Sequence, residues 1–194
     1  LQRLHQVLDQ RGMLNVLRKG FEDYGVHLQL MFPKPASQLN PDAWNQYRHN
    51  ILMVTRQVKY SLKNENSIDV LISLNGLPII TMELKNPLTG QKVDHAKRQY
   101  AENRDPKELL FQFKKRALVH FAVDPDEVYM ATKLAGHQTF FLPFNRGYNR
   151  GAGNPPNEHG FKTSYLWENI LRKDSLIDLL SRFIHLEVKE KKEG

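Results

Sequence analysis

Two runs of branched apolar residues flank an Asn-Gly pair, and no other feature constrains the fold of this chain as strongly. The first run covers residues 67–74, the second covers residues 77–85, and Asn75 and Gly76 lie between them. Branched side chains favour extended backbone, and Asn-Gly pairs favour tight turns with positive φ at both positions. The pattern therefore predicts a β-hairpin.

The register of this hairpin decides which polar side chains lie together, because a shift of one residue moves a side chain to the other face of a strand. A two-residue turn would pair Leu74 with Leu77. In a regular ladder it would also set Asp69 opposite Met82. Glu83 would then lie on the face away from Asp69, and the two acids would be separated.

A turn in which Gly76 forms a bulge shifts the pairing by one residue and sets Asp69 opposite Thr81. Glu83 then lies one diagonal step from Asp69, and Lys85 projects to the same side. The other face becomes wholly apolar, so this register separates a polar cluster from a core, and we predict the bulged turn. The predicted apolar face comprises Val70, Ile72, Ile80, Met82 and Leu84.

Two carboxylates and a lysine on one face are the residue types that metal-dependent phosphodiester hydrolysis requires. A divalent cation lowers the pKa of an attacking water and spreads the charge that develops on the phosphate. Mg²⁺ prefers oxygen ligands, so Asp69, Glu83 and the backbone carbonyl of Leu84 are its predicted ligands, with Mn²⁺ as an alternative. Lys85 is predicted to orient the water or help to deprotonate it, and to stabilise developing charge. The competing interpretation is that these are ordinary charged side chains on a half-exposed hairpin.

Positive charge is concentrated just after the hairpin. The chain has 28 Lys and Arg against 21 Asp and Glu, and the segment 85–116 carries +5 of the net charge of +7. This favours a polyanionic partner, and double-stranded DNA fits the predicted chemistry. Lys97, Arg98 and Arg104 are predicted to contact DNA phosphates, although a solvated helix face has a similar composition. The absence of cysteine excludes disulfides, zinc bound by thiolates and cysteine nucleophiles.

Hydrophobic periodicity predicts an α/β domain in which a central mixed β-sheet is flanked by helices. His120 lies in an apolar strand and is predicted to be a hydrogen-bonded core histidine rather than a metal ligand. Residues 145–160 combine glycine, proline and asparagine and predict a long surface loop. Helices are predicted at 1–24, 93–103, 106–115, 164–171 and 174–186, and further strands at 26–32, 50–60, 118–123, 128–132 and 139–142.

The acidic hairpin resembles the PD-(D/E)xK nuclease core as it occurs in the restriction subunit of type I restriction–modification enzymes. The motif residues are Ser67-Ile68-Asp69 and Met82-Glu83-Leu84-Lys85-Asn86-Pro87. The resemblance implies a restriction-endonuclease-like fold, Asp69 and Glu83 as metal ligands, and Lys85 as the catalytic lysine. It runs through nearly the whole chain and includes residues 75–78, 99–106, 118–123, 151–155 and 182–186.

Two positions depart from the family pattern. Ile68 stands where the core motif has proline, a position without catalytic atoms. Gln99 matches the glutamine of a Gln-x-x-x-Tyr element, and the resemblance implies that it is a further catalytic residue. Asn103 stands at the tyrosine position of that element, and Tyr100 lies beside Gln99 instead. The roles of Tyr100 and Asn103 are therefore left open.

The resemblance also implies that this chain is part of a larger enzyme. Residues 1–187 are predicted as the endonuclease domain, and the charged residues 188–194 as a linker towards an ATP-driven DNA translocase. ATP is then expected to bind the full-length subunit and not this fragment. Methylation and specificity subunits are the implied protein partners. The sequence has no secretory signal and no run of about 18 apolar residues, so we expect a cytoplasmic protein without membrane contact.

Two other functions fit the same residues. A repair nuclease or junction resolvase would use the same core and the same acids. A catalytically silent DNA-binding or assembly module would keep the fold and the positive charge without the chemistry. Such a module would bind DNA equally well with a divalent cation or with a chelator, which distinguishes it from a nuclease.

Overall fold

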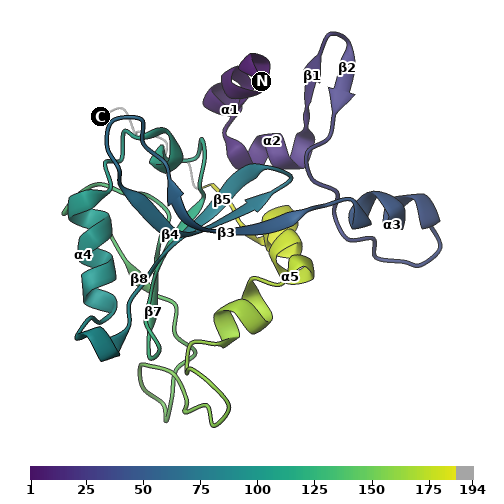
Figure 1. The fold of residues 1–194 in the computed structure, drawn as a ribbon. Helices are drawn as coiled ribbons and strands as arrows, with labels where there is room; N and C mark the ends of the chain where they lie inside the picture. Colours follow the sequence, from purple (N-terminus) through teal and green to yellow (C-terminus); the bar gives the residue numbers. More distant parts are fainter. Residues whose placement is uncertain (187–194) are drawn as a thin grey trace, which may run out of the picture.

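A six-stranded mixed β-sheet forms the centre of the protein, and helices cover both of its faces (Figure 1). The computed structural model describes residues 1–186, so the predicted domain boundary and linker at 187–194 lie outside the described residues. Strands β5 and β6 are parallel, and the other neighbours are antiparallel. The predicted α/β class with a central mixed sheet is confirmed. In spatial order the strands are β3 (Leu52–Lys59), β4 (Ser67–Leu74), β5 (Leu77–Leu84), β6 (Val119–Val123), β7 (Val128–Ala131) and β8 (Leu142–Pro143).

The turn between β4 and β5 differs from the bulged turn that the sequence predicted. Asn75 and Gly76 have φ angles of 50° and 84°, and Leu74 pairs with Leu77. Positive φ at both central residues is the geometry of a two-residue hairpin turn. The prediction of a bulge at Gly76 is therefore wrong.

The bulge lies inside β5 instead. Ser73 pairs with Pro78 and Ile72 pairs with Ile80, so Ile79 is the extra residue. Proline has no N–H to donate to a ladder and is tolerated in strands beside bulges, which explains this position. One extra residue shifts the pairing of every residue that follows.

This internal bulge still sets the two acids on one face. Val70 pairs with Met82, and continuing that register by one residue sets Asp69 directly opposite Glu83. The predicted partner of Asp69, Thr81, pairs with Leu71 instead. The prediction that Asp69 and Glu83 share a face is correct, although the predicted register is wrong.

Helix α4 (Val93–Asn103) covers the sheet face that carries Thr81 and Glu83, and its bounds match the prediction. It forms the crossover that connects the parallel strands β5 and β6. Val93 and Ala96 pack with Ala122 of β6. A second cluster on this side contains Ile68, Tyr100, Leu110, Phe111, Ala117, Ala131 and Leu134.

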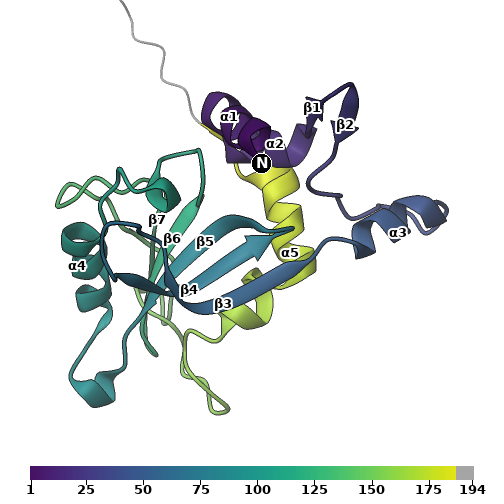
Figure 2. The same ribbon diagram turned by 45° about the horizontal axis from the view of Figure 1, so that its top comes forward.

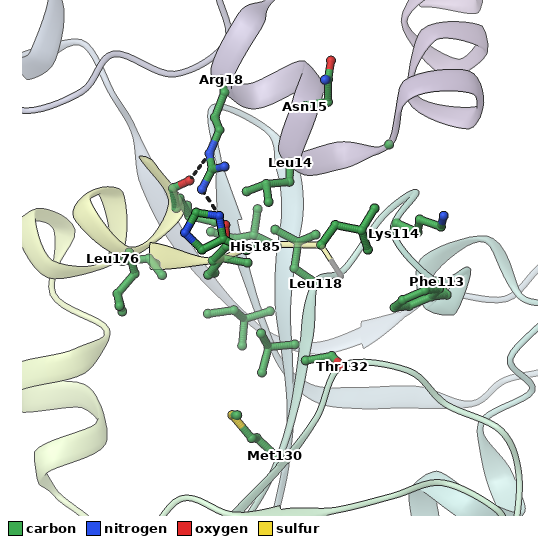
Figure 3. Close-up of a pocket in the computed structure, with 18 of the residues that line it drawn as sticks. Leu14, Asn15, Arg18, Phe113, Lys114, Leu118, Met130, Thr132, Leu176 and His185 are labelled. Carbon is green, nitrogen blue, oxygen red and sulfur yellow. Dashed lines mark hydrogen bonds between the residues drawn. The ribbon is translucent and has the colours of Figure 1, made fainter. Parts of the chain in front are cut away.

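The opposite face of the sheet packs against the N-terminal helices and the C-terminal segment, so the sheet lies between two helical layers (Figure 2). Arg18 joins these two parts, because it donates to the carbonyls of Leu180 at 2.6 Å and Ile184 at 2.7 Å. A largely apolar cavity of about 940 Å³ lies between them and the sheet (Figure 3). The covering elements are α1 (Gln2–Arg11), α2 (Met13–Lys19), η3 (Leu166–Ile170), α5 (Lys173–Asp178) and η4 (Leu179–Phe183).

The N-terminal third differs most from the predicted elements. The helix predicted at 1–24 is interrupted at Gly12 and Gly20, which have φ angles of 79° and 60°. Residues 21–28 form a small hairpin of β1 (Phe21–Asp23) and β2 (Val26–Leu28), so the strand predicted at 26–32 is short. Helix α3 (Pro41–Arg48) was not predicted. Asn40 caps its N-terminus, because the Asn40 side chain accepts a hydrogen bond from the N–H of Ala43.

The helices predicted at 164–171 and 174–186 are shorter in the structure, and η3 and η4 within them are π-helical. Two further predicted elements are also much shorter than predicted. The segment predicted as a helix at 106–115 contains only the 3₁₀ turn η2 (Leu109–Phe111). The strand predicted at 139–142 overlaps the short strand β8 only at Leu142. A short 3₁₀ turn, η1 (Pro87–Thr89), follows β5. Among the described residues, no helix has the length and apolar character to cross a membrane.

Candidate active site

Asp69 lies in β4, and both neighbouring strands hold its carboxylate. The backbone N–H of Leu84 in β5 donates to Oδ2 at 2.9 Å, and Gln57 Nε2 in β3 donates to Oδ1 at 3.0 Å. In extended backbone the N–H and C=O of one residue point to the same side, so the Leu84 carbonyl is directed towards the β4 side as well. Asp69 and Leu84, two of the predicted metal ligands, therefore lie beside each other across the β4–β5 pair.

Glu83 lies beside them and is completely buried. Arg104 donates to its Oε1 from Nε at 2.7 Å, and Nη2 of the same guanidinium forms an ion pair with Oε1 at 2.6 Å. Its Oε2 is buried and has no hydrogen-bond partner among the described residues. A buried carboxylate oxygen without a partner is unfavourable, and a cation is one group that would supply the missing interaction.

The electrostatics of Glu83 are strongly perturbed. Burial raises the pKa of Glu83 to about 8, the guanidinium of Arg104 opposes this, and the neighbouring carboxylate of Asp69 raises the pKa further. Carboxylates that share a site disfavour each other's ionisation, and a bound cation reverses that preference. A buried acid with such a shift is typical of functional sites.

Lys85 and Gln99 complete the group of predicted site residues. Lys85 lies two residues after Glu83 in the chain, so its side chain projects to the same face. Its Nζ donates to Gln99 Oε1, which comes from α4. The structure thus brings Asp69, Glu83, Lys85 and Gln99 together, while their catalytic roles remain predictions.

A buried hydrogen-bond network supports this face of the sheet. The Thr81 hydroxyl bonds to Tyr100 Oη at 2.9 Å and to His120 Nδ1 at 2.8 Å. Burial lowers the pKa of His120 to about 3 and raises the pKa of Tyr100 well above its ordinary value. The prediction that His120 is a hydrogen-bonded core histidine is confirmed. Asn103 contributes its backbone carbonyl, which accepts from Arg104 Nη1 at 3.2 Å.

The three residues predicted to contact DNA occupy different environments. Arg98 is exposed on α4, whereas Lys97 pairs with Asp94 at 2.6 Å and lies 4.0 Å from the centre of the Tyr129 ring. Arg104 is only 4% exposed, so the expectation of a phosphate contact from an exposed helix face is wrong for this residue. Its backbone is extended at the end of α4, and its side chain turns in towards Glu83. DNA contacts by Lys97 and Arg98 remain predictions.

The Asp69–Glu83 pair is the candidate metal centre. In residues 1–186 no group of three or more His, Asp or Glu side chains is arranged to hold a metal ion. Mg²⁺ does not need such a group, because it usually keeps several waters and binds one or two carboxylates. The large cavity on the opposite face has no acidic residue in its lining and does not offer such ligands.

Sequence reasoning missed two residues that surround this pair. Ser67 Oγ donates to Gln57 Oε1 at 3.0 Å, and the Ser67 carbonyl accepts from Arg104 Nη2 at 2.8 Å. Polar residues are common in edge strands such as β3 and at strand starts such as Ser67, so neither residue stands out in the sequence. The period-2 pattern of residues 50–60 indicated the strand, but only its pairing with β4 brings Gln57 to Asp69.

Comparison with known proteins identifies the family. The family described as type I restriction enzyme R protein N terminus matches residues 23–139, which is more than half of the chain. This range includes β3–β7 and all four predicted catalytic residues. No curated protein and no solved structure gave a significant match. The chain therefore belongs to the family of type I restriction enzyme R protein N-terminal regions.

Proposed function

We propose that this chain is a metal-dependent endonuclease domain that hydrolyses phosphodiester bonds of double-stranded DNA. The observation that carries this proposal is the convergence of Asp69, Glu83, Lys85 and Gln99 at one end of the β4–β5 hairpin. Membership of the restriction enzyme family supports the same reaction class and favours it over a repair nuclease on the same core.

The residues present fit a divalent cation of the Mg²⁺ or Mn²⁺ type. Asp69 and Glu83 supply carboxylate oxygens, and the Glu83 Oε2 is buried without a partner among the described residues, while Leu84, whose carbonyl is the third proposed ligand, contacts Asp69 through its N–H. Oxygen donors of this kind are the preferred ligands of these ions. When bound, such a cation lowers the pKa of water and offsets the charge of the scissile phosphate.

Lys85 is the protein's own cation at this site. Gln99 holds its Nζ on the face that carries Glu83, so the ammonium is positioned before substrate arrives. A fixed positive charge beside the phosphate stabilises the charge that develops during attack by water. We assign to Lys85 this electrostatic role and the orientation of the attacking water, and to Gln99 the orientation of Lys85.

The complete protein provides the proposed setting of this reaction. Lys97 and Arg98 on α4 are proposed to contact the DNA backbone. ATP would bind elsewhere in the full-length subunit and drive translocation along DNA. The methylation and specificity subunits would supply site recognition, within the cytoplasm.

One observation favours the silent DNA-binding or assembly module as a second candidate. Glu83 is already paired with Arg104, and a carboxylate neutralised by an arginine is a weaker cation ligand than a free one. In that case the hairpin would serve the fold alone. The two functions differ in their requirement for a divalent cation.

Plasmid nicking tests the choice between them. With Mg²⁺ or Mn²⁺, Asp69→Asn, Glu83→Gln and Lys85→Met are each expected to reduce the nicking rate by at least about 100-fold. Asp42→Asn, an exposed acid in α3, serves as the control and should leave the rate unchanged. Absence of nicking by the wild-type protein, together with DNA binding that is indifferent to chelator, would support the silent module.

A further inference from the structure

We propose that Gln57 is a positioning residue that holds the Asp69 carboxylate in the orientation needed to bind the cation. This inference rests on the proposed metal-dependent function. Arg56 of β3 pairs with Val70 of β4, so the next residue, Gln57, lies across from Asp69. Gln57, Asp69 and Glu83 therefore occupy three successive strands in one row across the sheet.

The side-chain contacts of Gln57 define which end of its amide faces the acid. Nε2 donates to Asp69 Oδ1 at 3.0 Å, and Oε1 accepts from the Ser67 hydroxyl at 3.0 Å. The reverse orientation would set the amide oxygen against a carboxylate oxygen, two acceptors with no proton between them. Ser67 thus orients the amide, and the amide in turn orients Asp69.

The backbone of Gln57 has an unfavourable conformation. Its φ angle is 50°, although it lies inside β3 and is not glycine. Positive φ is unfavourable for a residue that carries a Cβ, and such strain persists where neighbouring contacts require it. The residue with this unfavourable backbone is the one whose amide contacts Asp69.

Gln57 is also one link in a closed ring of contacts around both acids. The ring runs from Asp69 through Gln57 and Ser67 to Arg104, which donates to Glu83. The Leu84 N–H, next to Glu83 in the chain, donates back to Asp69 Oδ2 and closes it. Every member lies on β3, β4, β5 or the end of α4, so the two carboxylates are oriented by the same scaffold.

A neutral amide suits this task because it fixes the carboxylate without supplying a competing charge. A lysine or arginine at position 57 would neutralise Asp69 and weaken its attraction for a cation. Groups that orient metal ligands in this way commonly contribute about 10- to 100-fold to metal affinity. The structure therefore assigns to Gln57 a contribution to cation affinity rather than to DNA affinity.

Calorimetric titration of Mn²⁺ into Gln57→Gly tests this assignment. Glycine removes the amide and is free of strain at φ 50°, so the variant should unfold at the same temperature as the wild type or slightly higher. The Mn²⁺ Kd is expected to rise about 10-fold or more. Ser67→Ala, which loses only the orienting hydroxyl, should raise the Kd by a smaller factor. Thr55→Gly, in the same strand, is the control for a glycine in β3.

Nicking kinetics at saturating Mn²⁺ provide the second measurement. The KM for plasmid should stay unchanged in Gln57→Gly while kcat falls, because the Asp69 carboxylate is less well oriented. An unchanged Mn²⁺ Kd with a raised KM would show that Gln57 contacts DNA and would overturn the assignment. If the wild type bound no Mn²⁺, or if Asp69→Asn did not affect its binding, the proposed function would fail first and this inference with it.

Discussion

Glu83 shows how the site stores unfavourable electrostatic energy. One of its oxygens is held by Arg104, the other is buried without a partner, and burial with a neighbouring acid raises its pKa to about 8. Such an arrangement lowers the stability of the metal-free fold, and catalytic sites often have this property. A cation bound between Glu83 and Asp69 would relieve it.

His120 gives a prediction that does not depend on any ligand. Its pKa is lowered to about 3 by burial, whereas an unfolded chain would have an ordinary histidine pKa near 6.5. The unfolded state therefore gains a proton as the pH falls below about 6.5, and the folded state does not, so stability is lost towards acid. At pH 4.5 this residue alone should lower the free energy of unfolding by about 2 to 3 kcal/mol relative to neutral pH.

Urea unfolding of His120→Gln from pH 7.5 to pH 4.5 measures that contribution. The variant should lose less stability towards acid than the wild type by about this amount. His5→Gln, which replaces an exposed histidine of α1, is the matched control and should follow the wild type. Parallel acid curves for the wild type and His120→Gln would contradict a neutral buried imidazole.

The sequence alone identified Asp69, Glu83 and Lys85, because these residues belong to one hairpin and their spacing can be read directly from it. Arg104 could not be located in this way. Its charge and its place after a polar helix indicated an exposed cation, and the inward turn follows only from the extended backbone that ends α4. Gln57 was missed because its role depends on contacts with two other segments.

At the level of elements, the β4–β5 hairpin determines the site. Its two-residue turn alone would separate the acids, and the extra residue Ile79 brings them back to one face. The turn is also anchored to the rest of the fold through Asn75. Its Nδ2 donates to the Leu30 carbonyl at 2.8 Å, and its Oδ1 accepts from the Ile51 N–H at 2.7 Å.

These contacts predict unequal effects for two turn substitutions. Gly76→Ala should cost about 1 kcal/mol, because an added Cβ meets no atom within 4 Å and only the positive φ is unfavourable. Asn75→Ala should cost about 2 to 4 kcal/mol, since it combines the same backbone penalty with the loss of these hydrogen bonds. Thermal unfolding of both variants compares them, and equal effects would show that the Asn75 side chain does not anchor the hairpin.

The sequence predicted the hairpin, α4 and the main strands because strong periodicity and turn residues mark them. It misplaced the bulge, although Pro78 carried a signal, since a proline inside a strand often accompanies one. The amphipathic pattern of 106–115 predicted a helix that tertiary packing overrides. There Leu110 and Phe111 are buried, Lys114 has a φ of 60°, and its carbonyl accepts a hydrogen bond from the N–H of Met13.

At the scale of the whole molecule, the candidate site and the main core lie on opposite faces of the sheet. The face under α4 carries the acids and their hydrogen-bond partners, and the other face carries most of the core and the apolar cavity (Figures 1 and 3). The fold and the family agree with what the sequence predicted for residues 23–139. The metal, the DNA contacts and the reaction remain proposals that depend on the Asp69–Glu83 pair.

Calorimetric titration of Mn²⁺ and Mg²⁺ into the wild type, Asp69→Asn and Glu83→Gln tests that pair most directly. We predict one cation site in the wild type that is lost or weakened by at least about 10-fold in both variants and is retained in Asp42→Asn. Thermal unfolding of each variant confirms that it is folded. Cation binding that is equal in all four proteins, or absent from the folded wild type, would contradict a metal centre at this hairpin.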